Sequence, residues 1–584
     1  MTPARPRLLV LAVAVATALT GCTSIPGSSA PETIKPVELG NGGAPSITPP
    51  PNDVQPRDLV LAFLAASASA AAGSAQPRAF LAGDARVKWT PMSKVTILDG
   101  GTESVSTYQA DRSEVVVRGR AVGTLNNAGV YTPNPQGSSP AGPYTYHLVK
   151  VRGQYRIDGL SGGLVLTTDE FQQAFKQRSL YFYDLAGKYL VPDQRWTADS
   201  GLPLERWLLN QLANGPRPEL QNAVNSDTLP NQQVPSRLTV TSGAVTRVEI
   251  PGSSQLDSEA RYRLAAQVAQ TFEGVSAGLT LEITDGGDAV PITSNATQFT
   301  GSQFVDALGP TPPAPDVYFL RGGRIYGENN EPLAGAVNSS GPLLTAIAMR
   351  QPSPSAALAI AGLTGTGSSR RLYIGSQFGG LARTSVHGTL SRPAWAPGLG
   401  EVWVGQGRGL MRVPVEANGR AAAPIPVALP AVAGATRIVA LRFSPEGTRL
   451  ALVIATATGT QQLYLGAIVR SAGQVRVDTL TTPPLSPPGV IISDVAWPQA
   501  MKLFAIGYNA SNFDSRIFET DVDGAAFNAR PIGLLPLAPD SVTAAPGRPA
   551  WVSADGAVWE QSGSSWQSPD GTGQRNGGMP IYLE

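Results

Sequence analysis

The feature that most constrains the fold of this chain is a degenerate repeat in its C-terminal part. Five segments each combine an apolar strand-like start, a turn containing Ser-Pro or Gly, and a second apolar strand: residues 346–362, 392–404, 441–454, 495–507 and 548–560. Their starts lie about 46 to 54 residues apart, the spacing of four-stranded propeller blades. A β-sandwich would give strand periodicity without this longer repeat. The repeat therefore predicts an all-β propeller of about five to seven blades over residues 316–584.

The N-terminus carries the pattern of an export signal. Arg5 and Arg7 precede an apolar run from Leu8 to Leu19. This run of about 12 residues is too short to cross a bilayer, which needs roughly 20. We therefore predict a signal peptide over residues 1–21 rather than a transmembrane helix, and we expect everything after it to lie outside the cytoplasm.

The end of the apolar run, Leu-Thr-Gly-Cys at 19–22, contains the only cysteine of the chain. On one interpretation Cys22 is an ordinary residue near a small-residue cleavage site. On the other, the tetrapeptide resembles the bacterial lipobox, which implies diacylglyceryl transfer to the Cys22 sulfur and cleavage between Gly21 and Cys22. We favour the second, because the match directly follows an export signal in a chain with no other cysteine. Cys22 is thus the predicted lipid attachment site, and two or more acyl chains anchor a protein stably.

Two Pro-rich stretches divide the remaining sequence. Residues 22–55 are rich in Pro, Gly and Ser with little apolar periodicity, which is typical of a disordered tether. Four prolines within 309–316 indicate a linker, assigned to residues 301–315. Between these stretches we expect two α+β domains, so that the chain is multidomain.

The first α+β domain is predicted over residues 56–177. Val60, Phe63 and Leu64 share a narrow face of a helix that begins near residue 56. Strand-like runs follow, and the last contains a hairpin turn at residues 152–154. Helices followed by a long antiparallel sheet predict an NTF2-like cone, a fold that often holds a pocket.

The second α+β domain is predicted over residues 178–300, in the order strand, strand, helix, hairpin, helix, strand. Two helical faces are expected to enter its core: Leu204, Trp207, Leu208 and Leu212 in the first helix, and Leu264, Val268, Phe272 and Val275 in the second. This order, with the stretches LLNQLANGP and AQTF, resembles the GerMN domain of spore-germination and cell-envelope proteins. That domain family has no assigned catalytic residues, so the resemblance implies none here.

Several motifs of the sequence are candidates for catalytic sites. His147 and His387 are the only histidines and fall in different predicted domains, which excludes most His-based triads and His-rich metal sites. Residues 159–163 match GxSxG, but a nucleophile elbow needs a helix directly after the serine, and strand-like residues follow Ser161. We predict a turn there and a half-buried strand position for His147.

Three further motifs have structural interpretations that we prefer. Residues 521–524 begin like a calcium loop but lack its later ligands, so an inter-strand turn is predicted. Residues 405–409 are glycine-rich without a surrounding βαβ unit, so no dinucleotide site is expected. The tryptophans near the repeats are expected in blade cores rather than on a sugar-stacking platform: Trp395, Trp403, Trp497, Trp551 and Trp559. We therefore predict no enzymatic activity, no catalytic residues, no cofactor and no metal.

Taken as a whole, the chain resembles the LpqB family of actinobacterial lipoproteins. The resemblance rests on the domain order and on the stretch CTSIPGSSAP that begins at Cys22. It implies a protein anchored on the extracytoplasmic face of the cell membrane, accessory to the MtrAB two-component system. Such a protein would contact the extracytoplasmic region of an MtrB-like sensor histidine kinase and modulate signalling linked to cell-wall metabolism and division.

Two functions of different class stay open at this point. The net charge of +1, with no long run of either sign, argues against nucleic-acid binding. The first function is a non-enzymatic, membrane-tethered interaction protein, as the resemblance implies. The alternative is a lipoprotein that binds or hydrolyses a small envelope ligand, such as a glycan or peptide fragment, in the NTF2-like cone or the propeller channel.

Overall fold

The computed structural model describes most of the chain after the N-terminal region. The described residues are 50, 52–69, 75–99, 105–110, 113–134, 140–225, 229, 239–310, 316–471, 473–483, 490–509, 515–525, 530–531, 539–567 and 577–584. Residues 49–584 form one compact unit. The predicted signal peptide, Cys22 and most of the tether lie outside the described residues. Within the described residues, no helix has the length and apolarity needed to cross a membrane.

The first domain is built on a seven-stranded sheet with the order β6-β5-β3-β1-β7, in which β2 and β4 also pair with β3. The pairings are antiparallel except that of β1 with β7. Its strands are β1 (Lys94–Leu98), β2 (Val105–Gln109), β3 (Glu114–Asn126), β4 (Tyr131–Pro133), β5 (Pro140–Val151), β6 (Gln154–Leu160) and β7 (Leu164–Thr167). Its helices are α2 (Pro56–Ser69), α3 (Ala75–Arg78), α4 (Gly83–Lys88), the 3-10 turn η1 (Pro91–Ser93) and α5 (Thr168–Ala174).

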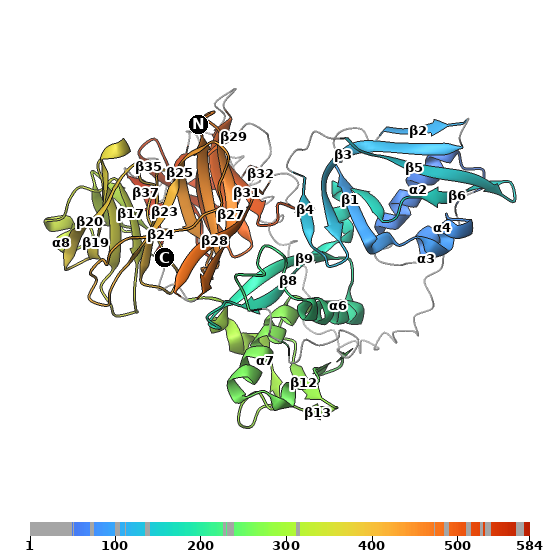
Figure 1. Ribbon diagram of the computed structural model, residues 1–584, viewed down its shortest axis with the longest axis horizontal. Coiled ribbons are helices and arrows are strands. Elements are labelled where there is room, and N and C mark those ends of the chain that lie inside the picture. The colour runs from blue at the N-terminus through green and yellow to red at the C-terminus, as the bar shows by residue number, and fades with distance from the viewer. Residues whose placement is uncertain are drawn as a thin grey trace, which may run out of the picture. The chain divides into compact units, whose positions relative to one another are not determined.

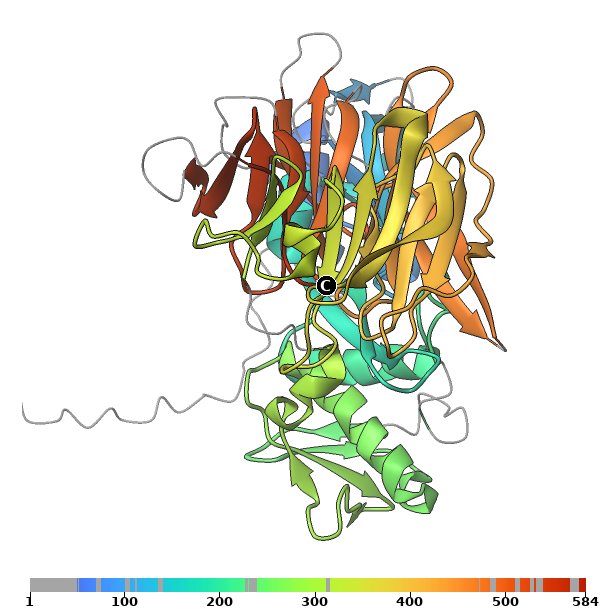
Figure 2. The ribbon, with the colours of Figure 1, turned by 90° about the vertical axis from the view of Figure 1, so that its left-hand side faces the viewer.

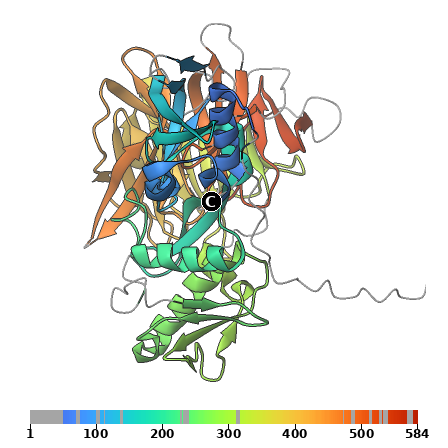
Figure 3. The ribbon, with the colours of Figure 1, turned by 90° about the vertical axis from the view of Figure 1, so that its right-hand side faces the viewer.

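Local sequence explains two features of this domain. Helix α2 buries Val60 and Phe63, as its pattern predicts, and contacts β2, β3, β6 and β7 of the sheet (Figure 3). The expected hairpin between β5 and β6 is present, and Arg152 and Gly153 form its turn with φ of 52° and 80°. Two consecutive left-handed residues match the right-handed twist of the strands that they join.

The second domain joins a two-stranded sheet, β8-β9, to the sheet β10-β11-β12-β13, with β14 paired to β12. Its strands are β8 (Lys176–Tyr183), β9 (Leu190–Thr197), β10 (Thr239–Thr241), β11 (Thr246–Glu249), β12 (Leu281–Asp285), β13 (Asp288–Ala289) and β14 (Gln298–Phe299). Its helices are α6 (Gly201–Asn214), η3 (Ser253–Gln255), α7 (Ser258–Glu273) and the 3-10 helix η4 (Gly301–Leu308).

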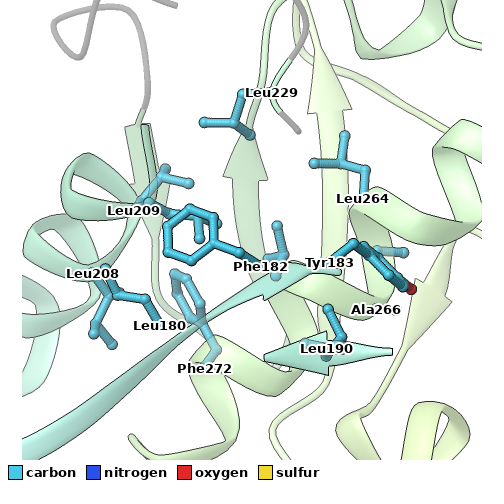
Figure 4. Close-up of a cluster of buried hydrophobic side chains, with 14 of the residues drawn as sticks. Leu180, Phe182, Tyr183, Leu190, Leu208, Leu209, Leu229, Leu264, Ala266 and Phe272 are labelled. Carbon is cyan, nitrogen blue, oxygen red and sulfur yellow. The ribbon is translucent and has the colours of Figure 1, made fainter. Parts of the chain in front are cut away.

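The core of the second domain lies between its helices and strands. Leu208 of α6 and Phe272 of α7 are fully buried beside Phe182 of β8 (Figure 4). The two helical faces predicted to enter the core are confirmed: Leu204, Leu208, Leu212, Leu264, Val268 and Phe272 are buried, and Trp207 and Val275 pack against them partly buried.

The third domain consists of six successive sheets, five of four strands and one of three, among the residues that the structure describes (Figures 1 and 2). Its strands are β15 (Tyr318–Arg321), β16 (Arg324–Gly327), β17 (Ala346–Arg350), β18 (Ala359–Thr364), β19 (Arg370–Ser376), β20 (Gly380–Gly388), β21 (Ala394–Trp395), β22 (Glu401–Gln406), β23 (Gly409–Pro414), β24 (Ile425–Val427), β25 (Ala435–Phe443), β26 (Arg449–Thr456), β27 (Gln461–Ser471), β28 (Gln474–Thr481), β29 (Val490–Gln499), β30 (Lys502–Asn509), β31 (Ser515–Asp521), β32 (Arg530–Pro531), β33 (Pro539–Thr543), β34 (Trp551–Ala554), β35 (Ala557–Ser562), β36 (Ser565–Gln567) and β37 (Gly578–Ile581). Two short helices, α8 (Ala336–Ser339) and η5 (Gly367–Ser369), lie between strands.

One strand from each sheet faces the centre of this domain. Strands β17, β21, β25, β29, β33 and β37 contact one another in that order, and β37 returns to β17, so the sheets close into a ring. The closing sheet joins both ends of the domain, since β37 pairs with β15 and places Ile581 opposite Tyr318. This arrangement is a β-propeller.

The register of the predicted repeat is wrong at its last segment. The first four segments cover the first and second strands of their sheets, whereas residues 548–560 cover the second and third, β34 and β35. The Arg-Pro-Ala-Trp sequence at 392–395 and 548–551 misleads, because Trp395 ends a first strand and Trp551 begins a second. Both rings are nevertheless buried, with 1% exposed.

Candidate functional site

The two histidines are far from forming a shared site. His147 lies on β5 of the first domain and His387 on β20 of the propeller. His147 occupies a strand position, as predicted; its side chain is 53% exposed, and its Nδ1 lies 3.1 Å from Oε1 of Glu114 on the neighbouring strand. His387 is also exposed, and its Nδ1 lies 2.9 Å from the backbone oxygen of Ser385.

The Ser161 region is the turn that its glycines predict. It connects β6 to β7, which precedes α5, so no helix directly follows Ser161. Gly163 has φ of 90°, and its backbone oxygen accepts a hydrogen bond of 3.0 Å from Nε1 of Trp89. Residues 405–409 likewise join β22 to β23, with the turn itself at residues 407–408.

Residues 521–524 also form the predicted inter-strand turn, closed by a hydrogen bond of 2.9 Å from the Gly524 amide to the Asp521 oxygen. Within the described part of the chain, no three His, Cys, Asp or Glu side chains gather as a metal-binding group. Asp523 instead points inward: it is 4% exposed and accepts a hydrogen bond of 2.8 Å from Nε1 of Trp196 in β9. Burial raises the pKa of the Asp523 carboxyl above its usual range.

Strand β9 connects all three domains, and we call residues 192–196 the junction strand. All eight residues of β9 are buried. Arg195 pairs with Asp193 at 2.7 Å and donates from Nη1 to the Ala128 oxygen of the first domain at 3.0 Å. On the propeller side, Arg449 donates a short hydrogen bond from Nη2 to the Pro192 oxygen.

The apolar cores follow the same connections. Ala525 of the propeller belongs to the core of the first domain, which also contains Trp196. Ala467 and Val469 of the propeller belong to the core of the second domain. A cavity of about 280 Å³ adjoins these contacts and is lined in part by Arg217 and Arg449. Because cores and buried polar contacts cross the domain boundaries, the three domains pack as one body.

A larger cavity, of about 600 Å³, lies at one end of the propeller ring, and we call it the mouth cavity. Every one of the six sheets contributes lining residues from the end of its central strand or the loop that follows. A proline follows the central strand in four of these lining segments: Pro352, Pro397, Pro445 and Pro546. This recurring proline is the sequence signal that could have located the cavity.

Buried charges lie at the wall of the mouth cavity. Arg442 lines it and donates from Nη2 to both oxygens of Asp494, at 3.2 and 3.3 Å. Asp494 also lies 3.6 Å from Nη1 of Arg392, so one carboxylate serves two guanidiniums. Glu584 lines the cavity as well and accepts a hydrogen bond of 2.5 Å from the Trp395 amide. Burial raises the pKa of Glu584, and burial lowers that of Arg392 to about 10.

The second domain closes part of the mouth cavity. Lys188 and Tyr189, from the β8–β9 loop, and Val305 and Leu308 of η4 are among the lining residues. A side-chain carbon added at Gly398 would lie 3.2 Å from the Tyr189 hydroxyl, so the loop and the propeller rim are in close contact. The cavity is therefore shared between two domains.

The tryptophans near the repeats are core residues, as predicted, with one exception. Trp395, Trp403, Trp497 and Trp551 are at most 4% exposed, whereas Trp559 is only partly buried. Trp395 and Trp497 touch the mouth cavity, but their Nε1 groups donate to backbone oxygens of Ala348 and Arg442 at 3.3 and 3.1 Å. Rings buried in this way offer little flat surface for a sugar.

Comparison with known proteins identifies the family. Residues 49–172 match the N-terminal domain of lipoprotein LpqB, and residues 324–582 match the LpqB β-propeller domain. Lipoprotein LpqB of Mycobacterium leprae is 31% identical over 481 residues, which cover 78% of each chain. The chain belongs to the LpqB lipoprotein family. Lipoprotein LpqB of Mycolicibacterium smegmatis is 29% identical, covering 76% of this chain and 78% of its own.

The LpqB relatives are lipoproteins by name, which implies a membrane-anchored place in the cell envelope. The LpqB propeller domain spans most of the mouth cavity, whereas Lys188, Tyr189, Val305 and Leu308 lie between the two matched regions. A gluconolactonase from Xanthomonas campestris is 15% identical with a TM-score of 0.29, covering 47% of this chain and 88% of its own. So low a score carries no argument about activity.

Proposed function

We propose that this LpqB-family lipoprotein is a non-enzymatic interaction protein on the extracytoplasmic face of the cell membrane. It is anchored through lipid on Cys22 after cleavage behind Gly21, and residues 22–55 tether the folded domains to the bilayer. Its partner is the extracytoplasmic region of an MtrB-like sensor histidine kinase. By binding this region it modulates MtrAB-type signalling linked to cell-wall metabolism and division. The resemblance to LpqB supplies the class of partner.

The observation that carries this proposal is the packing of all three domains around the junction strand. Arg195, Trp196 and the Pro192 oxygen each make a buried contact to the first domain or the propeller. Domains held in this way offer a partner one continuous surface, so little orientational entropy is lost at binding. A fixed body on a lipid tether is suited to meeting a receptor in the same membrane.

We also propose an NTF2-like fold for the first domain, a GerMN-like fold for the second and six blades for the propeller. The helices and curved sheet of the first domain support an NTF2-like fold, and the helix and strand order of the second supports a GerMN-like fold. The closed ring of sheets supports six blades for the propeller.

The test is recovery of the kinase from native membranes. Crosslinking followed by affinity purification of the anchored protein is expected to recover a sensor histidine kinase. The Cys22→Ala variant is the control, because the same folded domains are no longer held at the membrane and recovery should fall. Failure to recover any sensor kinase with the wild-type protein would contradict the proposal.

A second function is favoured by the mouth cavity. Its volume of about 600 Å³ lies within the range of small-ligand sites, roughly 300 to 1,000 Å³. It combines apolar walls with a few charged groups, as such sites do. We propose that the propeller binds an envelope ligand in this cavity, without hydrolysing it.

A further inference from the structure

Charged side chains give the mouth cavity an excess of positive charge. Among the described residues that line it, Lys188, Arg350 and Arg442 are cationic and Glu584 alone is acidic. Beneath the lining, Asp494 pairs with both Arg442 and Arg392. One carboxylate between two guanidiniums does not cancel the excess of positive charge. The cavity therefore attracts an anionic ligand, and its low-dielectric walls strengthen that attraction.

The cations belong to different elements of the cavity wall, and the two arginines have different partners: Arg350 donates to the Leu399 oxygen and Arg442 to Asp494. Lys188 comes from the β8–β9 loop, Arg350 ends β17 and Arg442 lies in β25. A single phosphate is bound by donors that converge on it, often as an arginine fork. Guanidiniums that are held by different partners instead suit carboxylates that are carried at intervals along a chain.

The positive charge of Arg350 is only partly balanced by the groups around it. Its guanidinium lies 5.6 Å from the ring centre of Trp395 and donates a short hydrogen bond from Nη1 to the Leu399 oxygen. Burial lowers the pKa of Arg350, which means that the cavity disfavours its charge as it stands. A bound carboxylate would compensate this charge.

The remaining lining offers apolar contact. Val305 is 55% exposed and Leu308 is 36% exposed, although both line the cavity. Exposed apolar side chains beside a concave surface are typical of a recognition site. Several prolines complete the wall, and an extended peptide packs well against such a surface of rings and aliphatic groups.

We propose that the mouth cavity binds an acidic peptide segment, with its carboxylates on Lys188 and Arg350 and its apolar side chains against Val305 and Leu308. This inference deepens the ligand-binding function proposed above and rests on it. Because the second domain supplies Lys188, Val305 and Leu308, the bound segment contacts both domains at once.

The test uses the full chain in detergent and a defined probe. The probe is a fluorescein-labelled peptide of Leu-Glu-Pro repeats, measured by fluorescence anisotropy. We expect saturable binding that weakens with added salt. The Leu-Lys-Pro counterpart is expected to bind at least about tenfold more weakly, because its charge opposes that of the cavity. The neutral disaccharide chitobiose is expected not to compete.

Two substitutions at the cavity have matched controls elsewhere. Lys188→Glu reverses an exposed cation and Val305→Asp places a charge on the apolar wall, and each is expected to weaken binding about tenfold. Arg383→Glu on β20 and Val87→Asp on α4 make the same changes at exposed positions outside the cavity and should leave binding unchanged.

Each outcome decides between the proposals. Equal binding by the cavity and control variants, or equal binding of both peptides, overturns the inference. Chitobiose binding in place of the acidic peptide, measured directly by isothermal titration calorimetry, overturns it while leaving ligand binding by the propeller intact. If neither peptide nor chitobiose binds, both proposals fail. Loss of binding in the cavity variants alone supports the acidic peptide segment.

Discussion

Replacing Trp196 by Phe tests whether the junction strand holds the domains together. The indole Nε1 donates a hydrogen bond of 2.8 Å to Asp523, a carboxylate that is 4% exposed. The ring also packs against Phe171 of the first domain, with ring centres 5.1 Å apart. Phe keeps an aromatic ring at this position but removes the N–H group, so the buried carboxylate loses the donor to its Oδ2 and keeps the one from the Ala525 amide to its Oδ1.

The expected cost follows from these contacts. A hydrogen bond to a charged group contributes about 1.5 to 3 kcal/mol, and the smaller ring adds about 1 kcal/mol for lost packing. We expect Trp196→Phe to lower the free energy of unfolding by about 3 kcal/mol. In a double-mutant cycle with Asp523→Ala, the coupling energy should be about 2 kcal/mol, because each single change removes the same hydrogen bond.

Two assays are used: urea unfolding measures the stability of each variant, and limited proteolysis of the folded protein maps its accessible cleavage sites. The matched control is Trp89→Phe, which removes a hydrogen bond of 3.0 Å to the Gly163 oxygen within the first domain. Both variants should be less stable, but only Trp196→Phe should expose new cleavage sites between the first domain and the propeller. Independent sites usually deviate from additivity by no more than about 0.5 kcal/mol. A coupling energy below this value would refute the role of this hydrogen bond.

Three further predictions concern stability. Burial, with the nearby charge of Asp523, raises the pKa of Asp521 to about 6, so its contribution to stability falls as the pH rises from about 4 to about 6. The free energy of unfolding of Asp521→Asn relative to wild type should therefore rise by up to about 3 kcal/mol between pH 4 and pH 7, as measured by urea unfolding. A difference that does not change with pH would contradict this. Phe272→Ala, in the core of the second domain, should cost about 3 to 5 kcal/mol by the same assay, and a cost below about 1 kcal/mol would argue against its full burial. Thr167→Ala removes the side-chain cap of α5, paired there with Glu170, and should cost about 1 kcal/mol; an unchanged midpoint would show that the cap is dispensable.

Periodicity within one element was enough to predict much of this fold. The buried faces of α6 and α7 were predictable because each helix packs along one stripe, and residues such as Leu208 and Phe272 recur at its spacing. The turns at Gly163 and Gly524 were predictable because glycine readily adopts positive φ, and both residues do so in the structure. The blades were predictable because each repeats an apolar strand pair.

Features that depend on distant parts of the chain were not predictable from one sequence. The closing sheet pairs β15 with β37, which lie at opposite ends of the domain, so neither shows a complete repeat. The hydrogen bond between Trp196 and Asp523 spans 327 residues, and nothing local marks it. His147 alternates correctly along β5 but faces solvent, since alternation does not tell which face of a sheet is covered.

The site was only partly predictable for the same reason. Cys22 was assigned from a contiguous motif next to an export signal, and it stays a prediction because it lies outside the described residues. The mouth cavity required the ring to close, because Lys188, Arg350 and Glu584 come from separate parts of the chain. The prolines after the central strands are visible in the sequence, but taken one at a time they indicate only turns.

The central claim is that the anchored protein modulates a sensor kinase in the same membrane. The most direct measurement is the phosphorylation of the response regulator in cells that lack this protein, compared with cells complemented by the wild-type chain or by Cys22→Ala. We expect deletion to change regulator phosphorylation, wild type to restore it and Cys22→Ala to restore it poorly. Phosphorylation that is the same in all three strains would contradict the account.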